Sequence, residues 1–301
     1  MNRSKLIFLI ALGMALSGAA AAQRPPIVGV AHIALKTDDL AAARSFYGKY
    51  LGMEEAFNLS KPDGGLEVTF FKVNDRQYIE VFPELKGETE DRLSHIAFET
   101  TNVQQMADYL ASRGVPATLR TLPDGNRSVF IKDPDHHTVE FVQYMPGSLE
   151  IRNAGKFLPA SRISERLGHV GFTVSDRAAA DHLFKDILGF REVWHGGFKD
   201  DGPPDWVAMR VPDGHDHLEY MLNVRNPSPK TLGVMNHLCL GVPSVEASYK
   251  ALLARGMKIA EPPKIGRDGK WQLNLYDPNF TRAELMEPSP VQKPCCSAFL
   301  E

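Results

Sequence analysis

The stretch Val28–Leu40, VGVAHIALKTDDL, decides the fold because similar stretches recur three more times along the chain. Each copy is a short alternating run with a histidine at the same place, followed by a polar residue suited to starting a helix and then a helical pattern. The other copies are Leu93–Val103 (LSHIAFETTNV), Leu167–Arg177 (LGHVGFTVSDR) and Met235–Val245 (MNHLCLGVPSV). Repetition of this kind predicts a fold built from four similar modules.

Each copy has an apolar face and a histidine face, because neighbouring side chains of a strand point to opposite sides. In the first copy Ile33 and Leu35 form the apolar face, which the following helix can cover. The histidines of the four copies are His32, His95, His169 and His237, and the residues two positions later are Ala34, Ala97, Gly171 and Cys239. These neighbours are all small, so each imidazole ring is expected to have space around it.

Every copy continues as a βαβββ unit. In the first, Asp38 or Asp39 is expected to cap a helix that runs to about Tyr50 and ends at Gly52. Strands are then expected at 54–59, 66–73 and 77–82, separated by turn-forming clusters.

The third and fourth copies echo the first and second. Phe46–Gly52 matches Leu183–Gly189, and Asp133–Asp135 matches Asp277–Asn279. The sequence therefore predicts an A-B-A-B order, with two duplicated domains of two modules each. We expect domain one at 23–147 (modules 27–83 and 93–145), a linker without periodicity at 148–164, domain two at 165–288 (modules 167–222 and 235–288), and a loose C-terminal tail at 289–301.

The last strand of every module carries a glutamate: Glu80, Glu140, Glu219 and Glu284. Apolar residues flank each glutamate and take the helix-facing side, so the four carboxylates are expected on the histidine face. A buried carboxylate without a partner is costly, and imidazole nitrogens with carboxylate oxygens form a typical site for a divalent cation.

Two metal sites are therefore expected, with His32, Glu80, His95 and Glu140 in domain one and His169, Glu219, His237 and Glu284 in domain two. For any single residue, a buried histidine or a rim glutamate with no functional role is the alternative interpretation. Eight residues in register, with a histidine-to-glutamate interval of 45 to 50 positions in every module, favour the metal sites.

The first 22 residues have the pattern of a secretory signal peptide. Arg3 and Lys5 precede the apolar run Leu6–Leu16, which is too short to span a bilayer, and Ala20–Ala22 forms a small-residue cleavage site. We expect a periplasmic or secreted protein with no stable membrane anchor after cleavage. Removing two positive charges changes the formal net charge from −3 to −5, which argues against a nucleic-acid partner.

Cysteines and scattered basic residues add little to this interpretation. The chain has three cysteines, of which Cys295 and Cys296 are adjacent, so a disulfide framework does not hold the fold together. Cys239 is interpreted as a small core residue. Five basic residues in loops or strands are interpreted as solvated surface charges: Arg127, Lys132, Lys264, Arg267 and Lys270.

The A-B-A-B modules, the element at Phe46–Gly52 and the Asp-Pro-Asp element at Asp133–Asp135 resemble the vicinal oxygen chelate (VOC) superfamily. This superfamily includes glyoxalase I, bleomycin-resistance proteins, methylmalonyl-CoA epimerase and extradiol dioxygenases. The resemblance covers almost the whole chain after residue 22. It implies an α+β fold of two VOC domains, whose βαβββ modules form cupped mixed sheets with helices on the convex face. It also implies a divalent metal ion (Zn, Ni, Co, Mn or Fe) that chelates neighbouring oxygens of a small-molecule substrate, in a monomer or homodimer.

The resemblance leaves three function classes open. Glyoxalase-like members take one ligand from the first and one from the last strand of each module, and the eight residues above fall on these positions. The leading expectation is therefore a metal-dependent lyase or isomerase, in which Glu140 and Glu284 match the catalytic base of glyoxalase-like members. Glyoxalase I itself acts on a glutathione adduct, a mainly cytosolic compound, so an exported relative is expected to use another substrate.

Two-domain extradiol dioxygenases are the alternative, since they resemble this chain in length. They typically keep only a two-histidine, one-carboxylate iron site in the second domain, which matches His169, His237 and Glu284. That interpretation leaves Glu219 and the quartet of domain one unexplained. A protein that sequesters its ligand, like the bleomycin-resistance members, comes third because those proteins generally lack the metal-binding residues.

Overall fold

The computed structural model describes residues 23–300, so the expected signal peptide at 1–22 lies outside the described residues. The first half contains β1 (Ile27–Lys36), α1 (Leu40–Ala43), η1 (Arg44–Tyr50), β2 (Glu55–Ser60), β3 (Leu66–Lys72), β4 (Tyr78–Phe82), β5 (Leu93–Thr100), α2 (Val103–Ser112), β6 (Thr118–Thr121), β7 (Arg127–Lys132), β8 (Thr138–Gln143) and α3 (Leu149–Arg152). The second half contains β9 (Arg166–Thr173), α4 (Arg177–Asp181), η2 (His182–Ile187), β10 (Arg191–Gly196), β11 (Trp206–Arg210), β12 (His217–Met221), α5 (Pro229–Met235), β13 (His237–Gly241), α6 (Val245–Ala254), β14 (Lys264–Ile265), β15 (Trp271–Tyr276) and β16 (Arg282–Met286).

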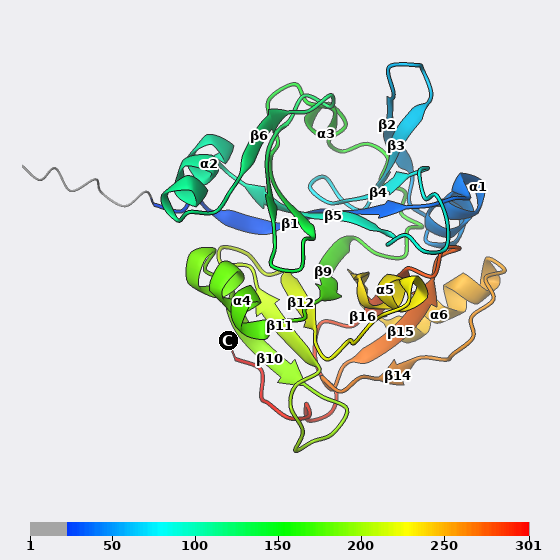
Figure 1. Cartoon of the computed structure of the whole chain (residues 1–301). Helices are drawn as coiled ribbons and strands as arrows, with labels where there is room; N and C mark the ends of the chain where they lie inside the picture. Colours follow the sequence, from blue (N-terminus) through cyan, green and yellow to red (C-terminus); the bar gives the residue numbers. More distant parts are fainter. Residues whose placement is uncertain (1–22, 301) are drawn as a thin grey trace, which may run out of the picture.

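These strands form two eight-stranded sheets with the same topology (Figure 1). The first has the order β2-β3-β4-β1-β5-β8-β7-β6, and the second has the order β10-β11-β12-β9-β13-β16-β15-β14. In each sheet the first strands of the two modules pair antiparallel at the centre, and each pairs in parallel with the last strand of its own module. The expected α+β fold of two cupped mixed sheets is confirmed.

Strand register places histidines and glutamates on one face of each sheet. In the first module Ala34 of β1 lies opposite Glu80 of β4, and Ala34 shares the face of His32 because the two are separated by two positions. In the second domain Cys239 of β13 lies opposite both His169 and Glu284. The alternation seen in the sequence therefore brings the polar residues together on the concave side.

The main helices begin where the sequence places a polar cap. The side chains of Asp39, Asn102, Asp176 and Ser244 each accept a backbone N–H from the first turn of the following helix. In the A-type modules the helix widens into the π-helical segments η1 and η2, which end before Gly52 and Gly189. Both glycines have positive φ, 74° and 82°, which stops the helix at little steric cost.

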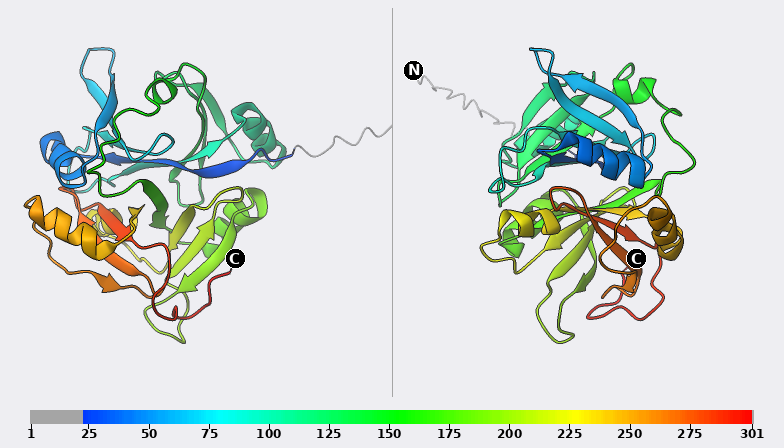
Figure 2. Two further views of the ribbon diagram at one scale, coloured as in Figure 1. Left: turned by 180° about the vertical axis from the view of Figure 1, so that it is seen from behind. Right: turned by 90° about the vertical axis from the view of Figure 1, so that its right-hand side faces the viewer.

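The two sheets stack back to back, and their concave sides open in opposite directions (Figures 1 and 2). Strand β1 contacts β9 in the middle. On one side the hydroxyl of Tyr109 in α2 donates to the carbonyl of Ile187 in η2, and on the other Arg255 after α6 donates to the carbonyl of Tyr50 in η1. A single hydrophobic cluster includes buried residues from both domains, so the domains share one core.

The linker expected at 148–164 and the tail expected to be loose at 289–301 each cover a concave side. The linker contains α3, capped by Ser148, and its Glu150 is only 3% exposed. The tail is not loose: Phe299 stacks on Trp194 with ring centroids 6.1 Å apart, and the Leu300 amide donates to the Val193 carbonyl. The tail packs because its aromatic residue finds an apolar surface beside β10. The adjacent Cys295 and Cys296 are joined by a disulfide.

Within residues 23–300, none of the helices combines the length and apolar character needed to cross a bilayer.

Candidate metal centres

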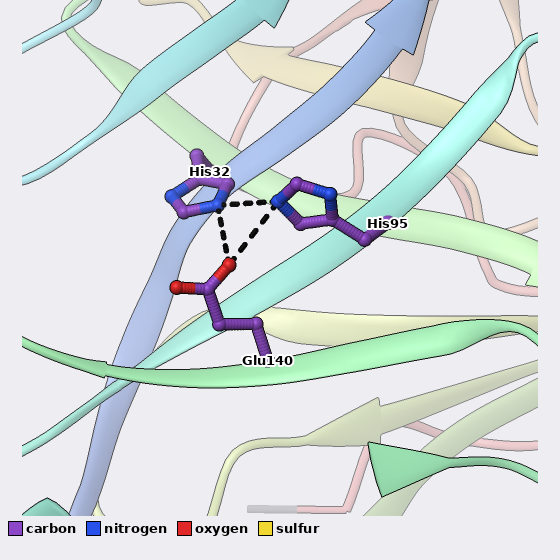
Figure 3. Close-up of side chains that lie close together, drawn as sticks. All are labelled: His32, His95 and Glu140. Atoms are coloured by element: carbon purple, nitrogen blue, oxygen red, sulfur yellow. Dashed lines mark hydrogen bonds and ion pairs between the residues drawn. The ribbon is translucent and has the colours of Figure 1, made fainter. Parts of the chain in front are cut away.

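Three side chains converge on the concave face of the first sheet: His32 from β1, His95 from β5 and Glu140 from β8 (Figure 3). The two Nε2 atoms lie 3.0 Å apart, and they lie 3.3 and 3.2 Å from Oε2 of Glu140. Donors at neighbouring corners of an octahedron with bonds of about 2.1 Å are separated by about 3.0 Å. The three donors therefore have the spacing of a facial triad around one divalent ion.

Glu80 completes the first group as a fourth side chain. Its carboxylate oxygens lie 3.3 Å from Nε2 of His32 and 3.7 Å from Nε2 of His95. The second oxygen of Glu140 accepts a hydrogen bond of 2.5 Å from the hydroxyl of Ser128, which fixes the orientation of that carboxylate.

The second sheet repeats this arrangement. Nε2 of His169 lies 3.1 Å from Nε2 of His237 and 3.4 Å from Oε2 of Glu284. Glu219 lies 3.2 Å from His237 and 3.9 Å from His169. Nδ1 of His237 lies 2.7 Å from the carbonyl of Met235 and can only donate a proton to it, so Nε2 is left with a lone pair for a metal.

The electrostatics of the first group favour a cation. Burial would lower the pKa of His32, but the carboxylates of Glu80 and Glu140 outweigh burial and raise it to about 9. Burial would raise the pKa of Glu140, but His32 and His95 hold it well below its usual range. A proton is thus held where carboxylates and imidazoles meet, and a divalent ion can take its place.

In the second group, burial would raise the pKa of Glu284, but the hydrogen bond with His169 and the charge of Arg282 lower it. For the histidine the effect of burial has the opposite sign. Burial would lower the pKa of His169, but Cys239, Glu284 and Glu219 raise it well above its usual value. Cys239 is buried as expected, but its thiol lies beside His169 on the concave face. Burial, followed by the charge of His169, lowers the pKa of the neighbouring His217 to about 3.

The small residue after His169 has a structural reason. A Cβ atom added to Gly171 would overlap the imidazole ring of His237, so that ring occupies the space a side chain would fill. The sequence argument that the small neighbour leaves room for an imidazole is therefore correct here, although the ring belongs to the histidine of the adjacent strand.

Gly171→Ala is expected to weaken metal binding by the second domain about 10–100-fold, the usual scale for disturbing the support of a ligand. The added methyl group must displace His237 from its donor position. Gly168→Ala is the matched control in the same strand, since its Cβ would meet only ordinary contacts at 3.8 Å or more. Competition against a chelator measures both affinities. Equal loss in the two variants, or in neither, would contradict this account.

The two concave faces differ in the space they offer. The cavity of the second domain has a volume of about 320 Å³, and that of the first about 110 Å³. Only the larger value lies in the usual range for small-ligand sites. Aromatic side chains that the sequence did not single out form walls of the larger cavity: Trp194, Phe198, Trp206 and Phe299.

Three of the five basic residues expected to be solvated surface charges line the larger cavity instead. They are Lys264, Arg267 and Lys270, and Arg282 lines the cavity with them. Arg127 and Lys132 line neither of the two metal-site cavities. The sequence shows no difference between these two sets, because the loop before β15 must fold over the site for its charges to matter. Glu150, also not singled out, lines the smaller cavity through α3.

All eight residues expected at metal sites lie in two groups of four, one on each sheet. Within each group the two histidines and the glutamate of the second module form the tighter set, and Glu80 and Glu219 lie at its edge. The glutamates expected to act as bases, Glu140 and Glu284, thus belong to the tight sets.

Comparisons with known proteins agree with this geometry. Two family models, both described as Glyoxalase/Bleomycin resistance protein/Dioxygenase superfamily, match residues 29–141 and 168–274. An iron-dependent extradiol dioxygenase of Rhodococcus jostii (strain RHA1) is 30% identical over 223 residues, which are 67% of this chain and 70% of that protein.

Solved structures show the same fold. The 2,3-dioxygenase LapB from Pseudomonas sp. KL28 matches with a TM-score of 0.65 and 15% identity, over 90% of this chain and 97% of that chain. Homoprotocatechuate 2,3-dioxygenase from Brevibacterium fuscum, in an anaerobic complex with 3,4-dihydroxyphenylacetate, matches with a TM-score of 0.64 and 18% identity, over 89% and 82%. Together with the two buried donor sets, the matches support a divalent metal cofactor.

Proposed function

Because the chain belongs to the glyoxalase/bleomycin resistance protein/dioxygenase superfamily, we propose that this metal-dependent enzyme is an extradiol-type ring-cleaving dioxygenase that uses iron(II) in its second domain. The observation that carries the proposal is a set of two histidines and one carboxylate, of which His169 and Glu284 line a ligand-sized cavity with aromatic walls. The 30% identical relative, itself an iron-dependent extradiol dioxygenase, supports it. The lyase or isomerase expected first from the sequence has no such relative among these matches.

The donor set of the second domain fits iron(II). Two imidazoles and one carboxylate in facial positions are the typical ligands of non-haem iron(II) oxygenases, and they leave other positions open. His169, His237 and Glu284 would hold the ion. Bound iron(II) supplies redox chemistry for dioxygen and a Lewis-acid centre for the two adjacent hydroxyl groups of a catechol.

The surrounding residues have roles that follow from their positions. Burial would raise the pKa of Glu219, but the hydrogen bond with His237 and nearby positive charges lower it, so this carboxylate is ionised at neutral pH. Its distance of 3.2 Å from His237 places it at the edge of the triad, where the ionised carboxylate can accept a hydrogen bond from a substrate hydroxyl and orient it. Trp194 and Trp206 can stack against the substrate ring and keep water from it.

The test is catechol-dependent oxygen uptake by the iron(II)-loaded protein. We expect one dioxygen to be consumed per catechol, with a ring-opened product that carries both oxygen atoms. Substrate conversion without oxygen uptake, accompanied by entry of solvent deuterium at a carbon next to a chelated oxygen, would instead show the lyase or isomerase reaction.

A lyase or isomerase stays the second candidate because each domain has a second carboxylate as a fourth possible donor beyond a facial triad, most clearly Glu80 in the first domain. In that reaction Glu140 or Glu284 would remove the proton. A ligand-sequestering protein is third, and it predicts no catalytic metal.

We also propose, from the pattern of residues 1–22, that the protein acts in the periplasm or outside the cell. The family resemblance suggests that it does so as a monomer or homodimer.

A further inference from the structure

The two cavities have opposite electrostatic character although their metal donors are the same. Four basic side chains line the cavity of the second domain, Lys264, Arg267, Lys270 and Arg282, and within residues 23–300 Asp268 is its one acidic lining residue besides the two glutamates of the metal group. Among the described residues that line the cavity of the first domain, none is lysine or arginine, whereas Glu67, Asp124 and Glu150 add acidic groups to its two glutamate ligands. The duplication has therefore kept the donors and changed the charge around them.

Arg282 is the basic residue closest in the chain to a metal donor. It stands two positions before Glu284 in β16, so both side chains lie on the concave face. The residue is half-buried, and its Nε atom is buried without a hydrogen-bond partner. The matching position of the first domain is Thr138, which carries no charge.

Lys270 is the second basic residue without a carboxylate partner. Its Nζ lies over the ring of Phe299, 4.7 Å from the ring centroid. Within residues 23–300 no ion pair joins Lys270 or Arg282 to a carboxylate, whereas Lys264 pairs with Glu261 and Arg267 pairs with Asp200. Two of the four positive charges are therefore free to bind a ligand.

A divalent ion would neutralise the charge of the two glutamates nearest to it, which leaves, in the part of the chain that the structure describes, four basic side chains against one further carboxylate, Asp268, beside the aromatic walls. A guanidinium at the rim of such a site is well suited to a carboxylate. We propose that the cavity of the second domain selects an aromatic diol with an acidic substituent, which Arg282 and Lys270 bind. This inference rests on the proposed ring-cleaving function and names its substrate class.

The test compares three catechols that each carry a short alkyl-chain substituent on the ring. The substituents differ in charge: dihydrocaffeate is anionic, 4-ethylcatechol is neutral and dopamine is cationic. Binding to the iron(II)-loaded protein without oxygen is followed by quenching of tryptophan fluorescence, since Trp194 and Trp206 line the cavity. We expect dihydrocaffeate to bind at least about 10-fold more tightly than 4-ethylcatechol, on the scale of a charge-assisted hydrogen bond, and dopamine to bind most weakly.

Arg282→Gln should remove most of this preference, because the charge-assisted contact with the acidic substituent is lost, and the affinity for 4-ethylcatechol measures what the charge of Arg282 contributes through Glu284. Lys270→Gln should reduce the preference as well, and it provides a second variant if Arg282→Gln does not fold. Arg225→Gln is the matched control, since Arg225 is exposed and lies outside the cavity lining.

The outcomes separate the two proposals. Equal affinities for all three catechols in the unmodified protein would overturn the substrate class and leave the dioxygenase proposal standing. Equal weakening of all three catechols by Arg282→Gln would also overturn it, because the residue would then act only through the metal ligands. Failure of every catechol to bind would overturn both proposals.

Discussion

His237→Ala is expected to lower catechol-dependent oxygen uptake by about 10³-fold or more, which corresponds to about 4 kcal/mol in the free energy of the transition state. The imidazole is fully buried, and its Nε2 atom lies 3.1 Å from Nε2 of His169. Its removal takes one of three donors from the ion and leaves the cavity in place. Oxygen uptake by protein loaded with iron(II) under identical conditions measures the loss.

His95→Ala is the matched substitution in the first domain, since His95 has the same place in β5 as His237 in β13. We expect it to remove one bound ion and to leave most of the oxygen uptake, because the first cavity is too small and too acidic for an anionic catechol. Metal analysis should show up to two ions per chain before substitution and one fewer in each variant.

The reverse result has a clear meaning. If His95→Ala abolishes turnover and His237→Ala does not, the reaction takes place in the first domain and the argument from cavity size and charge is wrong. If neither variant loses an ion, the two groups are buried polar clusters and not metal centres.

Much of the site could be predicted from the sequence because its residues lie on regular strands. Alternation fixes the face of a side chain as soon as the strand is identified, so His169 and Glu284 could be assigned to one face without knowing how the sheet pairs. The pairing of β9, β13 and β16 then brings them together through a register that the apolar residues determine. The two sites followed from local periodicity, repeated four times.

The rest could not be predicted, because it depends on segments without periodicity. Nothing in the local sequence distinguishes Lys270, which precedes β15 and lines the cavity, from Arg225, which is exposed. The stacking of Phe299 on Trp194 joins positions more than a hundred residues apart, and no repeated sequence pattern predicts this contact. The charge of each cavity is set by such segments, so the sequence indicated the metal donors but not the class of substrate.

Phe190 belongs to the core that the two domains share. Phe190→Ala is expected to lower the free energy of unfolding by about 3–5 kcal/mol, the usual cost of removing a buried phenylalanine. Phe190 is 1% exposed, and its ring packs against Phe98 of the first domain at 5.1 Å and against Phe184 of its own domain at 5.6 Å. The substitution thus creates a cavity where the two sheets meet.

Phe184→Ala makes the cooperativity testable, because its aromatic contacts, Phe172, Phe190 and Tyr220, all belong to the second domain. All three tryptophans of the chain also belong to that domain, so their fluorescence in urea follows it alone, whereas far-ultraviolet circular dichroism follows both sheets. If the shared cluster couples the domains, the two midpoints coincide in the unmodified protein and shift together in both variants. If the domains unfold independently, Phe184→Ala lowers the fluorescence midpoint and leaves a later dichroism transition in place. A separate transition of that kind would show that the contact between Phe98 and Phe190 joins two structures without making them one folding unit.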